Sequence, residues 1–349
     1  MGRAESRLSR SARPTMQDVA KLAGVSLKTV SRVVNQEPRV DHQTRARVEA
    51  AITELGFQPN SLASSLRRGR ASHTLGLVIE DIGNPFYSQI ARGVEEVADQ
   101  HHYMVIIGSN EKQAVREREL VGALLRRRVE GLLVVPASSD HRYMQPEVEH
   151  GTHVVFIDRP PMNLEADAIL LDNRGGARRG IEYLLAQGHR RIGFIGGDPS
   201  IFTGSERLAG YREALAASNI PLDEQLLCFA RHDIVQAEAA THQLLSLPQP
   251  PSAIFADNNR MSVGAIRVLR ARNPQMALLG FDDVELADML LLPIAVVTHD
   301  PTEMGRQAAH LLFDRIAGNQ RAPQRLMLPT QLIVRGSGRP QESAPTMIR

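Results

Sequence analysis

Ten short apolar runs between Thr74 and Asp300 constrain the fold of this chain more than any other feature of its sequence. They lack the polar alternation of a half-buried strand, which predicts strands buried on both faces, as in parallel sheets. Segments with apolar residues at helical spacing separate them, as in repeated βαβ units. Ten strands are too many for one small sheet, so we predict two doubly wound α/β lobes. The runs are TLGLVIE, YMVIIGS, GLLVVPA, HVVFIDR, AILLDN, RIGFIGG, LLCFARH, SAIFADN, MALLGFDD and IAVVTHD.

A different pattern precedes this body. From Thr15 to Gln36 the chain reads TMQDVAKLAGVSLKTVSRVVNQ, which predicts two short helices joined by a tight turn. Thr15 and Ser26 are favourable N-caps, and Gly24 can take the left-handed conformation that ends a helix. In a helix-turn-helix unit the second helix enters the major groove of DNA, whereas an ordinary surface hairpin is the alternative. The side chains expected to face inward are Val19, Ala20, Leu22, Ala23, Val30, Val33 and Val34.

A third helix is predicted between Asp41, its N-cap, and Gly56, which ends it. Val48, Ile52 and Leu55 are its expected buried stripe. Two helices of this size cannot make a core alone, but three can be marginally stable. The head is therefore predicted to be an all-α unit.

Charge is unevenly distributed along the 349 residues. Residues 1–70 hold 13 Lys and Arg against 6 Asp and Glu, although the net charge of the whole chain is only +2. A basic head on a mildly acidic body suggests that the head alone meets a polyanion, although a solvated basic tail would fit equally well. No apolar run suits a secretory signal or a membrane span, and the single Cys228 cannot form an intrachain disulfide. We expect a soluble cytoplasmic protein.

The segments DVAKLAGVSLKTVSRVVNQ and TRARVEAAITELGFQPNSLASSLRRGR, together with the two-lobed body, resemble the lactose repressor (LacI/GalR) family of bacterial transcription regulators. The resemblance extends from Thr15 to about Gly338. It implies that Leu27, Lys28 and Arg32 read base edges, and Lys and Arg side chains suit guanine. Other polar side chains of the head would position the phosphates. The predicted DNA contacts in the head are Thr15, Ser26, Leu27, Lys28, Thr29, Ser31, Arg32 and Asn35.

The stretch PNSLASSLRRGR, residues 59–70, links head and body. It can form two helical turns, which are not stable alone in water, so a flexible linker is the plain interpretation. The resemblance implies that two such segments pair in a dimer and fold on DNA. Leu66 would then wedge between base pairs from the minor groove, while Ala63 lets the two helices approach and Asn60 begins the segment. A ligand bound to the body could control DNA binding through this segment, because its order depends on the spacing of the two bodies.

Polar residues gather where several of the predicted strands end. In doubly wound sheets ligands bind at the carboxyl ends of the strands. A single Asp at such a place is often a helix N-cap, which is our interpretation of Asp172, Asp283 and Asp300. Carboxylates, amides and an arginine in one cleft suit a neutral polyhydroxy ligand, because they bind hydroxyl groups through charge-assisted hydrogen bonds. The strand-end residues are Asp158, Arg159, Asp172, Asn173, Asp257, Asn258, Asn259, Asp282, Asp283, His299 and Asp300.

The resemblance indicates which residues of the body form the predicted effector site. His299 lies where many family members have Gln, and it introduces a group that can titrate near neutral pH. His232 lies where some members have an aromatic stacking residue, for which Phe202 could substitute. The sequence ADNNR departs from the family's usual AND, so the asparagine register could slip by one. The predicted effector contacts are Phe86, Asp158, Thr203, Arg207, His232, Asn258, Asp282 and His299.

The predicted organisation is a basic tail (1–14), a helix-turn-helix domain (15–59), a hinge (60–71), a two-lobed effector and dimerisation domain (72–338) and a C-terminal tail (339–349). We predict a repressor that binds a pseudo-palindromic operator as a homodimer, with a sugar as effector and without a metal or cofactor. The alternatives are a purine or phosphocarrier-protein effector, a sugar-binding transport protein, and a sugar-modifying enzyme with a fused head. The sequence shows no dinucleotide-binding motif, no P-loop lysine and no catalytic set, so it does not support the enzyme alternative.

Overall fold

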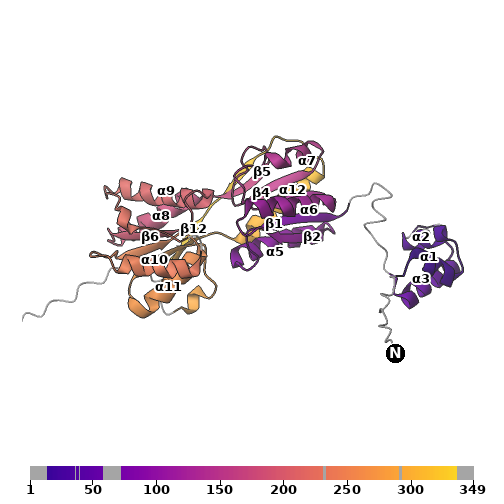
Figure 1. Cartoon of the computed structure of the whole chain (residues 1–349), viewed down its shortest axis with the longest axis horizontal. Helices are drawn as coiled ribbons and strands as arrows, with labels where there is room; N and C mark the ends of the chain where they lie inside the picture. The colour runs from indigo at the N-terminus through magenta and orange to yellow at the C-terminus, as the bar shows by residue number, and fades with distance from the viewer. Residues whose placement is uncertain are drawn as a thin grey trace, which may run out of the picture. The chain divides into compact units, whose positions relative to one another are not determined.

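The computed structural model describes residues 14–35, 37–38, 40–57, 72–230, 233–290 and 293–335. The chain divides into two compact units, Met1–Ser72 and His73–Arg349, which we call the head and the body (Figure 1). Four predicted contacts, Asn60, Ala63 and Leu66 of the hinge and His232 of the body, lie outside the described residues.

The described residues of the head form three helices: α1 (Met16–Ala23), α2 (Leu27–Val34) and α3 (His42–Leu55). Thr15 and Asp18 form a capping box at the start of α1, while Ser26 caps α2 and Asp41 caps α3. Gly24 ends α1 with φ 64°, a left-handed conformation that glycine adopts without steric cost. These boundaries confirm the predicted helix-turn-helix and third helix.

The core of the head differs in part from the expected one. Val19, Val30 and Val48 are fully buried, but Leu22 is 46% exposed, so its predicted inward position is wrong. At 100° per residue, Leu22 points roughly 100° away from the centre of the stripe formed by the buried residues of α1. Two residues of the predicted α3 stripe are only partly buried and pack at the edge of the core: Ile52 and Leu55.

Within the part of the body that the structure describes, the strands form two six-stranded sheets. The first has the order β11-β5-β4-β3-β1-β2 and the second β12-β10-β9-β8-β6-β7, which we call the first and second lobes. All pairings are parallel except that of β10 with β12. The first lobe contains β1 (Thr74–Ile79), β2 (Met104–Ser109), β3 (Gly131–Val134), β4 (His153–Ile157), β5 (Asp167–Leu171) and β11 (Arg325–Leu328); the second contains β6 (Ile192–Gly196), β7 (Leu227–Phe229), β8 (Ala253–Ala256), β9 (Ala277–Phe281), β10 (Ala295–Thr298) and β12 (Gln331–Ile333).

Helices cover both sheets, and the chain crosses between the lobes three times (Figure 1). These crossings follow β5, β10 and β11, so all three lie at the carboxyl ends of strands. The helices of the first lobe are α5 (Pro85–Gln100), α6 (Ala114–Arg126), α7 (Gln145–Glu149) and α12 (Pro301–Ile316); those of the second are α8 (Asn173–Ala186), α9 (Phe202–Ala217), α10 (Ile234–Leu245) and α11 (Asn259–Arg272); short 3-10 helices are η1 (Arg142–Met144), η2 (Glu224–Leu226) and η3 (Ala287–Met289).

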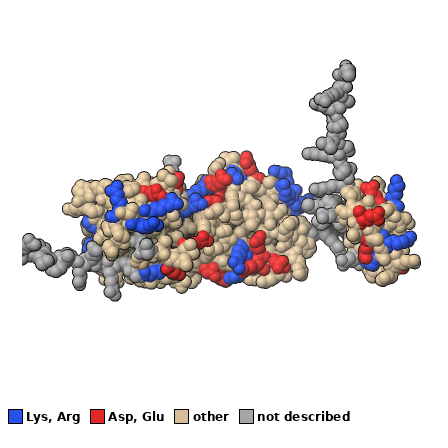
Figure 2. Space-filling view, turned by 90° about the horizontal axis from the view of Figure 1, so that it is seen from below, with Lys and Arg blue, Asp and Glu red and all other residues tan. Residues whose placement is uncertain are grey.

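The ten predicted strands all form, and the two-lobed α/β architecture is confirmed. Beyond them, β11 and β12 add an edge strand to each sheet. Basic and acidic side chains are interspersed over the visible face of the body (Figure 2). Among the described residues, every helix is too short or too polar to cross a membrane.

A cleft between the two lobes of the body

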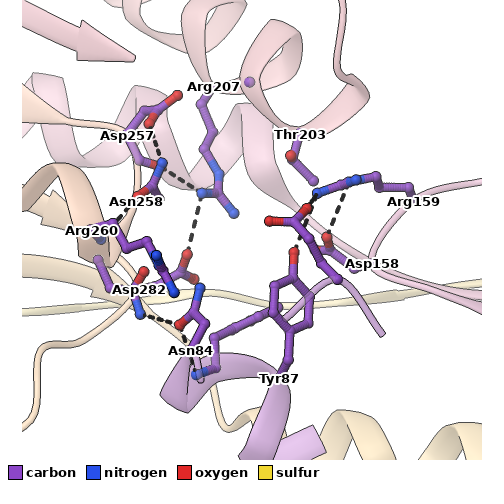
Figure 3. A pocket seen from close by; sticks show the side chains of 14 residues that line it. Asn84, Tyr87, Asp158, Arg159, Thr203, Arg207, Asp257, Asn258, Arg260 and Asp282 are labelled. Carbon is purple, nitrogen blue, oxygen red and sulfur yellow. Dashed lines mark hydrogen bonds and ion pairs between the residues drawn. The ribbon is translucent and has the colours of Figure 1, made fainter. Parts of the chain in front are cut away.

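The candidate effector site is a narrow cleft between the carboxyl ends of the two sheets (Figure 3). Its volume is about 40 Å³, which is room for water molecules but not for a sugar ring. Both lobes contribute walls from loops that follow strands and from the first turns of helices. The lining residues are Glu80, Asn84, Phe86, Tyr87, Asp158, Arg159, Thr203, Gly204, Arg207, Asp257, Asn258, Asn259, Arg260 and Asp282.

Asp158 and Asp282 occupy equivalent positions in the two lobes. Each follows the last residue of a strand, β4 or β9, and each backbone amide still donates to the neighbouring strand, at 2.8 Å. Both have positive φ, 71° and 62°, a conformation that Asp tolerates better than most residues. Both are buried, and Oδ1 of each carboxylate lacks a partner among the described atoms. The cleft therefore presents one buried, unpartnered acceptor from each lobe.

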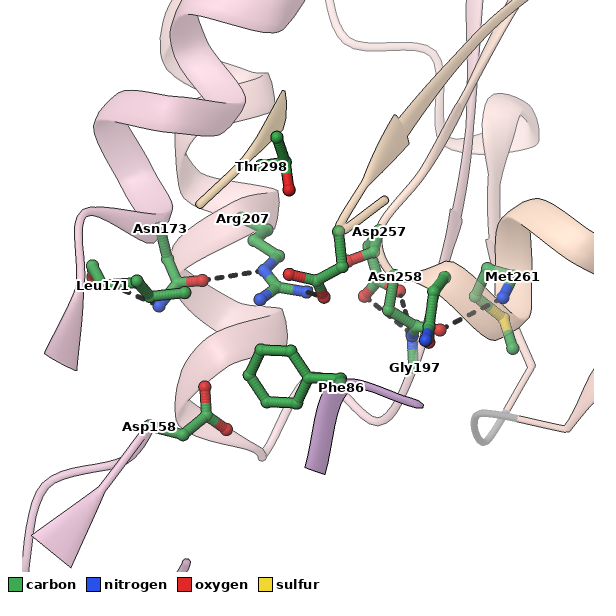
Figure 4. Close-up of polar contacts among 12 residues, drawn as sticks. Phe86, Asp158, Leu171, Asn173, Gly197, Arg207, Asp257, Asn258, Met261 and Thr298 are labelled. Carbon is green, nitrogen blue, oxygen red and sulfur yellow. Dashed lines mark hydrogen bonds and ion pairs between the residues drawn. The ribbon is translucent and has the colours of Figure 1, made fainter. Parts of the chain in front are cut away.

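Arg207 forms the centre of the second-lobe wall (Figure 4). Its Nε donates to Oδ1 of Asn173 at 2.8 Å, and Nη1 lies 3.3 Å from Oδ2 of Asp282. The guanidinium also stacks 3.7 Å above the ring of Phe281. These contacts hold the buried side chain of Arg207 in one orientation, and Arg207 in turn holds the carboxylate of Asp282.

A charged network forms the first-lobe wall. Arg159 pairs with the carboxylate of Glu80 and donates to the hydroxyl of Tyr87 at 3.2 Å. Nζ of Lys112 lies 3.5 Å from Oε1 of Glu80. Nε of Arg159 also lies 3.5 Å from Oδ2 of Asp158, which leaves Oδ1 of Asp158 without a partner among the described atoms.

Two contacts join the lobes at the rim of the cleft. The side-chain amide of Asn259 donates to Oδ1 of Asn84 at 2.7 Å. Arg260 forms an ion pair with Asp81 across the same gap. Both partners from the first lobe follow β1, and both from the second begin α11, so these contacts hold the cleft closed.

Burial shifts the protonation of three groups in this region. It raises the pKa of Asp158 and that of Asp257 to about 6, in spite of the nearby arginines. It lowers the pKa of His299 to about 4. The expectation that His299 titrates near neutral pH is therefore wrong, because the imidazole is buried and its neutral form is favoured.

The cleft brings together most of the predicted effector residues. Phe86, Asp158, Thr203, Arg207, Asn258 and Asp282 all line it. His299 lies instead in an adjoining cavity, and Phe202 is absent from the lining. Asn258 also caps α11, accepting from the amides of Arg260 and Met261.

The predicted helix caps are confirmed at two of three positions. Asp172 caps α8 and Asp300 caps α12. Asp283 does not cap a helix, because the next helical turn begins at Ala287; its carboxylate instead pairs with Arg335 at 2.8 Å.

Five lining residues were not predicted: Glu80, Asn84, Tyr87, Gly204 and Arg260. Glu80 directly follows β1, so the strand-end rule could have found it, and Asn84 caps α5 four residues later. Tyr87 and Arg260 lie inside helices next to predicted residues, where the sequence pattern carries no signal of their direction.

The head presents a second polar surface on α2. Leu27 and Lys28 are exposed, while Thr29, Ser31 and Arg32 are half-buried. Thr15 and Ser26 form the caps of α1 and α2, and Nδ2 of Asn35 approaches the hydroxyl of Ser31 at 3.2 Å. Arg32 lies 3.7 Å from Glu37, a distance at which a partly exposed arginine remains free to change partner.

Comparison with known proteins identifies similar chains over nearly the whole length. Residues 15–60 match the family of bacterial regulatory proteins of the lacI type, and residues 181–338 match the periplasmic binding protein-like domain. The HTH-type transcriptional regulator CelR of Thermobifida fusca is 37% identical over 95% of this chain and 100% of its own. A solved structure of a CelR–cellobiose complex has 34% identity and a TM-score of 0.69 over 93% of this chain and 100% of its own. The Lac repressor dimer bound to operator and the anti-inducer ONPF has 27% identity and a TM-score of 0.80 over 94% of this chain and 100% of its own.

Proposed function

The chain belongs to the LacI family of bacterial regulatory proteins, and from this membership we propose that it is a repressor whose operator affinity is controlled by a neutral sugar in the interlobe cleft. It is a DNA-binding transcription regulator. Within the proposal, residues 15–59 bind DNA, residues 60–71 form a hinge, and residues 72–338 bind the effector and a second copy of the chain.

One observation carries the choice of a sugar: the pair of unpartnered acceptors, Oδ1 of Asp158 and Oδ1 of Asp282. A buried carboxylate oxygen without a partner is unfavourable, and a ligand hydroxyl that donates to it removes this cost. Because the two oxygens come from different lobes, a polyhydroxy ligand that donates to both would join the lobes. The ring of Phe86 offers an apolar face beside them.

A cleft of about 40 Å³ must widen before a sugar can enter. The ligand would thus bind an open state and favour one interlobe angle over another. It can change DNA affinity only by its differential affinity for the two states. The change would reach the head through the hinge.

On the DNA side, Leu27, Lys28 and Arg32 are proposed to contact base edges in the major groove. Thr29, Ser31 and Asn35 would contact phosphates, together with the cap residues Thr15 and Ser26. The proposed minor-groove contacts in the hinge are Asn60, Ala63 and Leu66. A homodimer would place two such heads on a pseudo-palindromic operator.

The alternative effectors differ from a sugar in what the cleft would have to provide. A purine would need a stacking slot, for which Phe86 is one candidate wall, and a phosphocarrier protein would bind an outer face rather than the cleft.

We propose that the chain acts by binding alone, without catalysis, and in the cytoplasm, where its operator would lie. Its relatives CelR and the Lac repressor are regulators.

The test is a thermal-shift screen of the full chain against pentoses, hexoses, disaccharides, polyols, sugar phosphates and purines. A ligand at about 100 times its Kd adds roughly 2.7 kcal/mol to the free energy of unfolding, which gives a clear shift. Asp282→Ala should abolish that shift, whereas Asp314→Ala, on the exposed face of α12, should preserve it. A shift by purines alone, or by none of these compounds, would refute the sugar.

A further inference from the structure

A second cavity adjoins the effector cleft. It has a volume of about 360 Å³, against about 40 Å³ for the cleft itself. Phe86 and Asp282 line both, so the two spaces are neighbours that share a wall. The outer walls come from α5 and from the residues at the ends of β9, β10 and β12. Protein pockets that hold small molecules have volumes of about 300–1,000 Å³, and this cavity lies within that range.

His299 stands in the wall of this cavity with its hydrogen-bonding capacity unused. Its side chain is 4% exposed, and neither ring nitrogen has a hydrogen-bond partner among the described atoms. Nδ1 lies 4.0 Å from Oδ1 of Asp282, which is too long for a hydrogen bond. The imidazole and the ring of Phe86 pack edge to face, with centroids 5.5 Å apart. Both nitrogens are buried, so they reach a ligand only when the site widens; one ligand hydroxyl could then donate to the unprotonated nitrogen and a second could accept from the N–H.

The charge of the lining restricts the ligand. The charged residues in the wall are all acidic: Asp282, Asp283, Glu285 and Asp300. Gln89 and Gln331 add uncharged amides at the outer edge. Asp282 and Asp283 are paired with Arg207 and Arg335, and Glu285 and Asp300 leave the lining with a net negative charge. This charge disfavours a phosphate or carboxylate, while neutral hydroxyl groups would find acceptors and donors on several sides.

We propose that the effector is a neutral disaccharide or longer oligosaccharide, with one sugar unit in the cleft and the next in this second cavity. The inference rests on the proposed sugar effector and adds the size of the ligand. Asp282 would serve both units, since Oδ1 is unpartnered and the residue lines both spaces. His299 and Gln89 would bind the second unit only, because they line the cavity and are absent from the lining of the cleft.

The test compares the binding of matched sugars to the full chain by isothermal titration calorimetry: glucose with cellobiose and maltose, galactose with lactose, and xylose with xylobiose. We expect one disaccharide to bind at least about tenfold more tightly than its own monosaccharide, because each added hydrogen bond contributes a factor of about two to ten. A monosaccharide that binds as tightly as every disaccharide containing it would overturn the two-unit effector and leave the sugar effector intact.

Variants of α5 locate the second unit. Gln89→Leu should weaken the disaccharide about two- to tenfold and leave the monosaccharide unchanged, since Gln89 lines the second cavity alone. Gln100→Leu, an exposed glutamine at the end of the same helix, is the matched control and should change neither. Equal weakening of both sugars by Gln89→Leu would contradict the assignment. If no saccharide of either size binds, the proposed sugar effector itself fails.

Discussion

Arg32 is the residue at which the proposed DNA recognition can be tested most directly. It is partly exposed on α2, and its weak contact with Glu37 at 3.7 Å leaves it able to turn toward a base. Arg32→Ala should cost about 1–3 kcal/mol of operator affinity and relax specificity at one base pair. Competition binding against a library of operator variants measures both effects. Lys21→Ala, an exposed cation of α1, is the control and should weaken all sequences alike; the same uniform loss for Arg32→Ala would refute base recognition.

His299 makes the stability of the body depend on pH. Burial lowers its folded-state pKa to about 4, with Asp282 and Asp300 favouring the charged form and Arg207 opposing it. The unfolded chain takes up the proton at about pH 6.5, so this residue destabilises the folded state as pH falls from 6.5 toward 4.

His299→Gln removes this dependence. The slope that His299 contributes is at most about 1.4 kcal/mol per pH unit below pH 6.5. Relative to wild type, the variant should therefore gain stability between pH 7.5 and 5. Urea unfolding at several pH values measures the difference, which should be constant above pH 7. A difference that does not vary with pH would show that His299 does not titrate between the two states.

At the scale of elements, helices α5 and α12 approach so closely that two positions require glycine. A Cβ on Gly93 would lie 2.0 Å from the carbonyl oxygen of Thr302, and one on Gly305 would lie 2.1 Å from that of Ile90. Gly305→Ala should therefore lower the Tm and destabilise the body by about 1–3 kcal/mol. Gly122→Ala on α6 is the matched control, since the added Cβ would meet only the end of the Arg126 side chain, at 3.3 Å. Equal effects would mean that the helices move apart freely.

The elements also show how far the sequence alone leads. The apolar runs predicted ten strands because buried parallel strands lack polar alternation, but β11 and β12 read RLML and QLI and lie at sheet edges with exposed side chains. Asp158 and Asp282 were predicted as effector contacts because each follows a parallel strand, and ligands bind at the carboxyl ends of such strands. It could not distinguish Asp283, which lies two residues after the end of β9 and pairs with Arg335 instead. Partners so distant in sequence leave no periodic signal.

At the scale of the whole body, the contacts across the cleft rim set the balance between open and closed states. Asp81 is informative because it pairs with Arg260 across the gap but does not line the cleft. Asp81→Ala should thus act on the effector through closure alone. Because the closed cleft is too small for a sugar, loss of this contact should raise effector affinity. The pair is about one-third exposed, so the expected gain is at most about 1 kcal/mol, or roughly fivefold.

Glu238→Ala is the matched control, because Glu238 pairs with Arg267 of the same α11 at 2.9 Å but entirely within the second lobe. Calorimetric titration of the effector into each variant gives the comparison. If opening accompanies binding, only Asp81→Ala strengthens effector binding, because this variant has no rim ion pair to break before the cleft widens. Equal affinities for Asp81→Ala and Glu238→Ala would mean that the rim contact is the same in the free and bound states, and the ligand signal would have to arise from Asp158, Arg207 and Asp282 within the cleft.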